Sequence, residues 1–502
     1  MSHWIIAPVI LPALVGAAIM LFMRNDLLLQ RVFSLASTLA LTAIAAALLW
    51  AATLHPPEVY FLGNWPAPFG IVLVLDRLSA LMVMLTALLA VAIQLYAIGS
   101  DWDARGRHFH ALFQFQLMGI SGAFLTGDAF NLFVFFEVLL IASYGLMIHG
   151  GGKDRLRAGV QYVAFNLVGS SLFLFALATI YAVTGTLNIA DLAVKAQTLP
   201  EGDDALFRVA AVMLMLVFAV KGALVPLQFW LPATYANAPG PVAALFAVMT
   251  KIGAYAAIRF GVMVIPPSTP ATGTLIADLM MPAAIATLII GAIGVLGAST
   301  LGRLAAFAAI ASMGTAFIAI SAFTPAATAA ALYYIVHSTL AGAALFLIAD
   351  LVADRRAHDR LDQALPPIQN SGLIAGLFMA SAIATAGMPP LSGFFGKLLV
   401  MDALRDQAAL VWSVILITSL VVILGFARAG STLFWKAHAA APLEGPRHEP
   451  QGLAFTATFG LLAGLVALTV FAGPVMAWME ATALSLHDPA AYIAANQLPQ
   501  VK

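Results

Sequence analysis

Five ionisable side chains stand inside long apolar segments of the sequence, and their types suit proton transfer. They are Glu137 in NLFVFFEVLLIASYG, Lys221 in LMLVFAVKGALVPLQFWLP, Lys251 in ALFAVMTKIGAYAA, His337 in ALYYIVHSTLAGAALF and Lys397 in ATAGMPPLSGFFGKLLV. A charge at the centre of a bilayer costs about 2.5–3.5 kcal/mol on insertion scales, so such groups pair, change protonation state or face water. Because carboxylate, ammonium and imidazole groups all exchange protons, these residues are candidates for proton transfer.

The carboxylate of Glu137 and the ammonium of Lys221 form a candidate proton switch. Burial lowers the pKa of a lysine and raises that of a glutamate, whereas a close opposite charge has the reverse effect on each. A contact that forms and breaks would therefore change the proton affinity of Lys221. The alternative is a static ion pair between helices, which explains less well why Lys251 and Lys397 lack an obvious carboxylate in their own segments. For His337, a relay role and a packing role both stay open, since an unperturbed pKa of about 6.5 suits either.

Several other kinds of chemistry have no support in the sequence. The chain has no cysteine, which excludes disulfides, thiolate metal sites and a cysteine nucleophile. His448-Glu449 lacks the second histidine of a zinc-protease motif, and neither a P-loop nor a G-x-G-x-x-G motif is present. The 23 Lys and Arg balance the 23 Asp and Glu, so no basic excess is available to bind nucleic-acid phosphates. We therefore expect no cofactor, no metal site and no nucleic-acid partner.

The composition indicates a polytopic membrane protein. Of the 502 residues, 62% are hydrophobic and 9% are charged, with a mean hydropathy of +0.98, whereas soluble domains carry about 25% charged residues. A transmembrane helix needs about 20 mostly apolar residues. Windows of that kind predict an all-α fold with about fourteen transmembrane helices, at 4–23, 32–53, 72–98, 109–127, 130–149, 158–183, 207–230, 240–262, 280–298, 302–322, 327–351, 371–403, 408–434 and 452–479. The first window lacks a basic flank and a cleavage site, so we expect a retained helix and not a signal peptide.

The distribution of Lys and Arg between the loops predicts the orientation, because these residues concentrate in cytoplasmic loops. If the first loop is cytoplasmic, that side collects Arg24, Arg31, Arg105, Arg107, Lys153, Arg155, Arg157, Arg303, Arg355, Arg356, Arg360, Arg428, Lys436 and Arg447. The other side collects Arg77, Lys195, Arg208, Arg259, Arg405 and Lys502. Both termini are then predicted to face away from the cytoplasm. Asp76, Arg77 and Asp128 lie at span ends and are interpreted as structural, and the run DLVADRRAHDRLD at 350–362 as a solvated loop.

Two of the predicted helices contain residues that break helices. In the seventh, Pro226 and Pro232 follow Lys221; in the twelfth, Gly387, Pro389, Pro390 and Gly393 precede Lys397. Proline removes a backbone donor and clashes with the preceding turn, so both helices should be interrupted within the membrane. Interrupted helices at corresponding positions are typical of transporters built from repeats, which suggests two five-helix units, spans 4–8 and 9–13. Ordinary proline kinks are the alternative, since the lysine stands on opposite sides of the prolines in the two helices.

Three motifs together resemble a known family. NLFVFFEVLLIASYG, VKGALVPLQFWLPATYANAPGPVAALFAVMTKIGAY and GMPPLSGFFGKLLV are similar, in order and spacing, to the proton-channel membrane family shared by respiratory complex I and Mrp-type cation/proton antiporters. The segment LPATYANAPGPVAALF and the chain length most resemble the D subunits of Mrp (also called Pha) multi-subunit monovalent cation/proton antiporters. The resemblance covers nearly the whole chain.

The resemblance implies fourteen helices with two inverted five-helix repeats, and a proton path along a central polar axis. The corresponding boundaries are 1–108, 109–262, 263–436 and 437–502. It also implies that Glu137 and Lys221 form a functional pair, that Lys251 is a relay and that Lys397 is the terminal group. Relatives often carry a lysine four residues after the histidine at position 337, where this chain has Ala341, so water has to assist His337 there.

The implied function is that of a transporter subunit and not of an enzyme, in a bacterial plasma membrane, with other Mrp subunits, protons, monovalent cations and lipid as partners. Two alternatives stay open: an antiporter-like subunit of a complex I-type NADH:quinone oxidoreductase or membrane hydrogenase, and a structural scaffold subunit. Sodium prefers several oxygen ligands, yet Glu137 is the single carboxylate deep within the predicted spans. We therefore expect this chain to conduct protons and its partners to contribute the cation path, with Na⁺ and K⁺ not distinguished.

Overall fold

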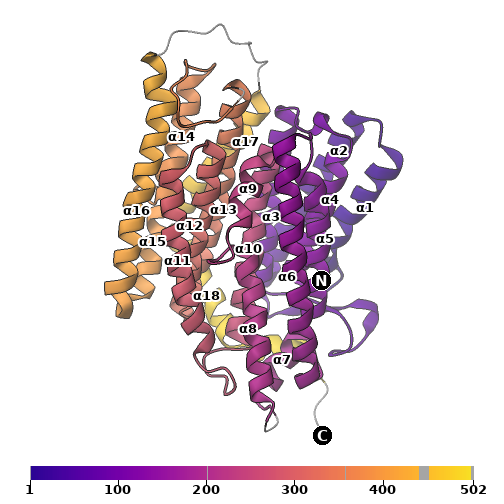
Figure 1. The fold of residues 1–502 in the computed structure, drawn as a ribbon. Helices are drawn as coiled ribbons and strands as arrows, with labels where there is room; N and C mark the ends of the chain where they lie inside the picture. Colours follow the sequence, from indigo (N-terminus) through magenta and orange to yellow (C-terminus); the bar gives the residue numbers. More distant parts are fainter. Residues whose placement is uncertain (1, 200–201, 357, 440–450, 499–502) are drawn as a thin grey trace.

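The protein is a bundle of long helices that stand side by side, as the computed structural model shows for residues 2–199, 202–356, 358–439 and 451–498 (Figure 1). Within these ranges, eleven helices are long and apolar enough to cross a membrane, and α4 and α14 are shorter apolar helices. The predicted all-helical membrane architecture is confirmed. Arg447, Lys502 and the His448-Glu449 pair lie outside the described residues.

The bundle begins at one edge and its last helices return to the middle. The N-terminal helices are α1 Ala7–Phe22, α2 Leu27–Leu54 and α3 Arg77–Gly99. The next group comprises α4 Phe109–Leu125, α5 Ala129–Met147, α6 Lys153–Thr184, α7 Ile189–Lys195, α8 Asp204–Lys221, α9 Trp230–Asn237 and α10 Gly240–Met263. The third group comprises α11 Leu275–Gly297, α12 Leu301–Ile320, α13 Pro325–Arg356, α14 Ser371–Ala386, α15 Ser392–Ala403 and α16 Ala408–Gly430. The C-terminal α17 Gly452–Val470, α18 Ala472–His487 and α19 Ala490–Ala495 follow, and α17 packs against α3 and α13. Short turns of 3-10 helix are η1 Ser2–Ile6, η2 Leu62–Asn64, η3 Asp103–Arg105, η4 Arg405–Gln407 and η6 Lys436–Ala439, and η5 Ser431–Trp435 is a π-helical turn.

Both predicted breaks fall where the prolines are. The seventh predicted helix is divided into α8, which ends at Lys221, and α9, which begins at Trp230. The twelfth is divided into α14 and α15, with Gly387 in the left-handed conformation between them (φ 79°). The fourteenth predicted window is also divided, at Phe471, which the sequence analysis did not predict.

The predicted start of the third helix, at residue 72, was wrong. Strand β2, Val72–Leu75, pairs antiparallel with β1, Glu58–Phe61, so that Glu58 faces Leu75 and Phe61 faces Val72. The sequence VLVL is apolar enough to extend a helix window, but its alternate β-branched residues favour a strand. The helix therefore begins only at Arg77, after Asp76 caps it by accepting a hydrogen bond from the backbone of Ser79 (2.8 Å).

Two charged groups that the sequence analysis counted with the loops lie in helices. Arg259 lies within α10 and is 1% exposed; it forms a bidentate ion pair with Asp76, in which Nη2 donates to Oδ1 at 2.9 Å. The first two turns of the run 350–362 are the end of α13, and the carboxylate of Asp350 accepts hydrogen bonds from Tyr96 and from Trp102 (2.8 Å each). The interpretation of that run as a solvated loop was therefore wrong for Asp350, because the aromatic donors come from distant segments.

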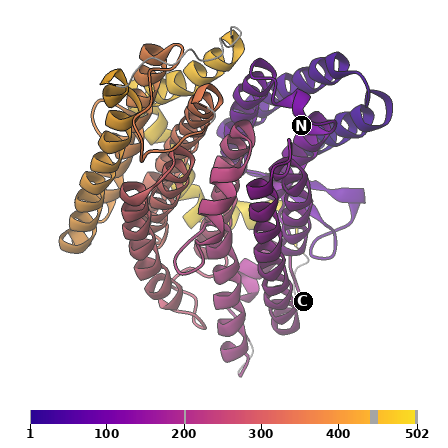
Figure 2. The same cartoon turned by 45° about the horizontal axis from the view of Figure 1, so that its top comes forward.

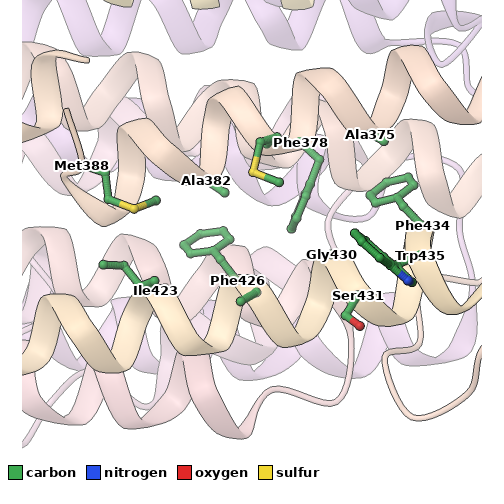
Figure 3. Close-up of a pocket in the computed structure, with 12 residues that line it drawn as sticks. Ala375, Phe378, Ala382, Met388, Ile423, Phe426, Gly430, Ser431, Phe434 and Trp435 are labelled. Atoms are coloured by element: carbon green, nitrogen blue, oxygen red, sulfur yellow. The ribbon is translucent and has the colours of Figure 1, made fainter. Parts of the chain in front are cut away.

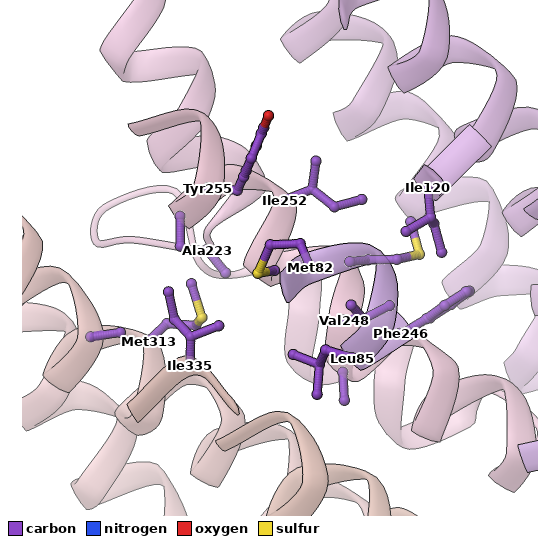
Figure 4. Close-up of a cluster of buried hydrophobic side chains, with 14 of the residues drawn as sticks. Met82, Leu85, Ile120, Ala223, Phe246, Val248, Ile252, Tyr255, Met313 and Ile335 are labelled. Atoms are coloured by element: carbon purple, nitrogen blue, oxygen red, sulfur yellow. The ribbon is translucent and has the colours of Figure 1, made fainter. Parts of the chain in front are cut away.

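The interior of the bundle is formed by α10, α12 and α13. All residues of α10 are buried, and α10 lies in the middle of the bundle in both views (Figures 1 and 2). Side chains from α3, α4, α12 and α13 converge on it, as Figure 4 shows for Met82, Leu85, Ile120, Phe246, Val248, Ile252, Met313 and Ile335. These helices are more buried than the peripheral α1, α2 and α16, and they are also less apolar, since the peripheral helices face lipid.

Candidate proton-transfer axis

Lys221 is the last residue of α8 and its ammonium is buried at the break in the seventh predicted helix. Nζ donates a hydrogen bond to Oδ1 of Asn166 on α6 (2.9 Å) and lies 5.5 Å from the ring centre of Phe136. A helix C-terminus carries partial negative charge, which favours an ammonium group there. Helix α10 approaches this end closely, because a Cβ atom at Gly253 would lie 2.6 Å from the backbone N of Gly222.

Glu137 lies on α5 and is half-buried, and its Oε1 accepts a hydrogen bond from the hydroxyl of Ser170 on α6. In the structure, Glu137 and Lys221, both described residues, form no direct ion pair. The direct contact that the sequence suggested is thus not formed in this conformation. Its place is taken by two neutral residues one helical turn apart on α6, Asn166 and Ser170, which bind one member of the pair each.

Lys251 lies halfway along α10 and is 1% exposed. Its Nζ donates to the thioether sulfur of Met313 on α12 (3.2 Å), which is a weak acceptor. Met313 belongs to the apolar cluster of Figure 4. The surroundings therefore resemble a hydrophobic core into which one ammonium group has been placed.

His337 lies on α13 and contacts the second broken helix. Its Nδ1 shares a hydrogen bond with the hydroxyl of Ser392, the first residue of α15 (2.9 Å). The next residue is glycine for a steric reason: a Cβ atom at Gly393 would lie 1.9 Å from the carbonyl oxygen of Ala384 and 2.9 Å from Nε2 of His337. The histidine is thereby held at the junction between α14 and α15.

Lys397 lies on α15, but its side chain reaches back to the end of α14. Nζ donates to the carbonyl oxygen of Ala386, the last residue of α14 (2.8 Å), and to the hydroxyl of Ser419 on α16 (2.9 Å). Both lysines thus lie at the C-terminal end of a half-helix, since Lys221 is the last residue of α8 and Lys397 binds the last carbonyl group of α14. This geometry explains why the two lysines can stand on opposite sides of the prolines in the sequence.

Two small cavities adjoin the second half of this arrangement. Each has a volume of about 10 Å³, roughly what one water molecule needs. Lys397 lines one of them, His337 and Ala341 line the other, and Tyr334 and Thr385 line both. The hydroxyl of Thr385 is buried and has no hydrogen-bond partner among the described residues. The space beside Ala341 is therefore polar on one side.

We call Glu137, Lys221, Lys251, His337 and Lys397 the axis residues. The residues that sequence reasoning missed are four neutral hydrogen-bond partners of the axis residues, Asn166, Ser170, Ser392 and Ser419, and also Thr385, which lines both small cavities. Serine and threonine are common where membrane helices pack together, and asparagine is uncharged, so the presence of these residues gave no signal. The signal that was available is their spacing, since Asn166 and Ser170 lie four residues apart and so share one face of α6.

A much larger cavity lies elsewhere and is apolar. It has a volume of about 590 Å³ and lies between α14, α16 and η5, lined by Phe378, Phe426 and Trp435 among others (Figure 3). Ser431 supplies a hydroxyl, and no axis residue lines it. We therefore do not assign proton transfer to this cavity.

Comparison with known proteins identifies the family of this chain. Residues 126–424, which include all five axis residues, match the family described as "NADH:quinone oxidoreductase/Mrp antiporter, TM". The chain belongs to this family. The D subunit of a probable K(+)/H(+) antiporter of Rhizobium meliloti (strain 1021) is 38% identical, over 97% of this chain and 96% of the relative. The D subunit of a Na(+)/H(+) antiporter of Bacillus subtilis (strain 168) is 36% identical, over 99% of each chain.

A solved structure extends the comparison to the whole fold. A chain of the Mrp complex from Dietzia sp. DQ12-45-1b superposes with a TM-score of 0.88 at 27% identity, covering 99% of this chain and 100% of that one. The predicted resemblance to D subunits of Mrp antiporters is confirmed by these family members. Neither the quinone oxidoreductase alternative nor the scaffold alternative is favoured by them.

Proposed function

We propose that this chain is the proton-translocating subunit of a multi-subunit monovalent cation/proton antiporter, and that protons move along the five axis residues. The names of the relatives support antiport, and they include both K⁺ and Na⁺ as the cation. We assign the cation path to partner subunits, because a sodium ion prefers several oxygen ligands and Glu137 is the single carboxylate among the axis residues. The chain would act within a hetero-oligomeric membrane complex.

One observation carries the proposal: the buried ammonium groups of the axis bind neutral acceptors. Lys221 binds an amide oxygen, Lys251 a thioether and Lys397 a carbonyl and a hydroxyl. A cation that serves only to hold helices together would be expected to have a carboxylate, as Arg259 has in Asp76 on the same α10 helix as Lys251. Neutral acceptors stabilise the protonated lysine less than a carboxylate would, so the lysine can still release its proton.

The contacts support a proposed order of transfer. Movement of the ammonium of Lys221 toward Glu137 stabilises the charged lysine, and movement away favours release of its proton. The tight approach of α10 at Gly253 brings the helix of Lys251 against that of Lys221. From Lys251 the proton would pass to His337 and Lys397, with water in the two small cavities bridging the position of Ala341.

The two units that contain this path correspond to residues 109–262 and 263–436. Each has a broken helix as its fourth transmembrane segment, α8 with α9 in the first and α14 with α15 in the second. The segment 1–108 and the segment 437–502 would flank these units. We place the chain in a bacterial plasma membrane, because the relatives described above are bacterial, and we place both termini on the non-cytoplasmic side because of the Lys and Arg bias between the loops.

The proposal is tested with the complete complex, purified with its native partner subunits and reconstituted into vesicles. We expect Na⁺- or K⁺-dependent proton flux in the wild type and its loss in Lys221→Ala. The matched control is Lys153→Ala, which removes an exposed lysine at the start of α6. Normal flux in assembled Lys221→Ala complexes would favour a scaffold role and refute the proposal.

A further inference from the structure

We infer that α6 supplies substitute partners for the Glu137–Lys221 pair: Asn166 binds the ammonium and Ser170 binds the carboxylate whenever the two charges separate. This inference rests on the proposed function and deepens it, because it assigns positioning roles to two residues outside the axis. The conformation seen here is then the separated one. In the other conformation Lys221 leaves Asn166 and contacts Glu137 directly.

The geometry of α6 supports these roles. Asn166 and Ser170 are buried, lie one turn apart, and bind Lys221 and Glu137 respectively. The side-chain nitrogen of Asn166 donates to the carbonyl oxygen of Tyr162 (2.9 Å), which turns its oxygen toward Lys221. The same face of α6 also contacts Val220, the residue before Lys221.

That contact is made through a glycine. A Cβ atom at Gly169 would lie 3.5 Å from Cγ1 of Val220, an ordinary van der Waals distance, so α6 faces the end of α8 between the two polar residues. Helices α6 and α8 pack along each other, as do α5 and α6. The position of Asn166 relative to Lys221 is therefore set by helix packing and not by a loop.

The chemistry explains why neutral groups are needed. Two opposite charges that separate in a medium of low dielectric constant each lose their partner, and an unpaired buried charge is strongly unfavourable. An amide oxygen satisfies an ammonium, and a hydroxyl donor satisfies a carboxylate. Neither group takes up or releases a proton in the accessible pH range, so each holds its charge without competing for the transported proton.

The titratable groups around this corner include Glu137 and Tyr144 on α5, Tyr162 on α6, Tyr235 on α9 and Lys251 on α10. The hydroxyl of Tyr162 is engaged with that of Ser143 (2.9 Å). Of these groups, Glu137 is the acidic one, so a second carboxylate introduced at position 166 would compete directly with it for Lys221.

The test uses substitutions in the reconstituted complex, with cation-dependent proton flux measured as a function of pH. Asn166→Leu removes the acceptor, and we expect flux to fall by about tenfold. Asn166→Asp offers a permanent charge to the ammonium, so proton release needs higher pH; we expect the flux profile to move to alkaline pH by about one unit. Asn166→Ser, which keeps an oxygen acceptor, should retain more flux than Asn166→Leu.

The chain offers matched controls on α6 itself. Ser170→Ala should lower flux, whereas Ser171→Ala should not, because Ser171 is exposed and binds the carbonyl oxygen of Leu167. Gln161→Leu, on the exposed face, controls for the polar-to-apolar change at Asn166.

Wild-type flux and an unchanged pH profile in assembled Asn166→Leu and Ser170→Ala complexes would overturn the inference. If Asn166→Leu does not assemble, Asn166→Ser, Asn166→Asp and Ser170→Ala decide by the same readouts. Failure of the inference is distinguishable from failure of the proposed function, because in the first case Lys221→Ala still abolishes flux while the α6 variants transport normally.

Discussion

Replacing Lys251 with methionine separates a proton-carrying lysine from a structural one, because the two roles lead to opposite changes in stability. A charge at the membrane centre costs about 2.5–3.5 kcal/mol. Its hydrogen bond to the sulfur of Met313 offsets about 1 kcal/mol at most. Methionine is unbranched and similar in length, so it fills the same space without a cavity. We therefore expect Lys251→Met to stabilise the fold by about 1.5–2.5 kcal/mol while abolishing proton flux.

The matched control is Arg259→Met, two turns further along α10. Arg259 is as buried as Lys251 but is paired with Asp76, and removing one partner of a buried ion pair destabilises by about 3–5 kcal/mol. The assay is unfolding of the purified complex in mixed micelles with increasing denaturing detergent, followed by flux measurements in vesicles. Destabilisation of Lys251→Met of the same size as that of Arg259→Met, or normal flux in Lys251→Met, would refute the reasoning.

Three further predictions concern the ends of the axis, each measured as cation-dependent proton flux in assembled complexes. Glu137→Ala should abolish flux, since the ammonium of Lys221 then has no carboxylate to contact; near-normal flux would count against a switch. Lys397→Ala should block flux and His337→Ala should only reduce it, because in the proposed path water in the two adjoining cavities can replace the histidine; the reverse ranking would show that the exit group is misassigned. Gly387→Ala should destabilise the fold by about 1–2 kcal/mol, because the backbone of Gly387 is left-handed. It should also slow flux, because the added Cβ atom would lie 2.7 Å from Cδ of Lys397. Gly372→Ala, where no atom lies within 4 Å of the added Cβ, should be neutral, and equal effects of the two substitutions would contradict the steric argument.

The helices and the deep ionisable residues were predictable because both depend on strong, local signals. Long apolar windows predict spans from composition alone, and a lysine within such a window is rare enough to stand out. Lys251 is an example: nothing except its burial in an apolar run identifies it. The breaks near Lys221 and Lys397 were predictable for the same reason, since proline acts on its own helix.

The partners of these residues were not predictable, because they depend on how helices pack. Asn166 and Ser170 come from α6, which no charge marks as important, and the reach of Lys397 back to Ala386 depends on the angle between α14 and α15. The burial of Asp350 likewise depends on Tyr96, a residue about 250 positions away in the chain. One sequence shows which side chains are costly to bury but not which neutral groups receive them.

Proton flux through the reconstituted Lys221→Arg complex tests the central claim most directly. Arginine keeps a positive charge and can bind the oxygen of Asn166, but its guanidinium does not release a proton at accessible pH. If Lys221 passes protons along the axis, the variant complex should assemble normally and show no cation-dependent proton flux. Wild-type flux in Lys221→Arg would contradict the account, because a fixed positive charge would then be sufficient at this position.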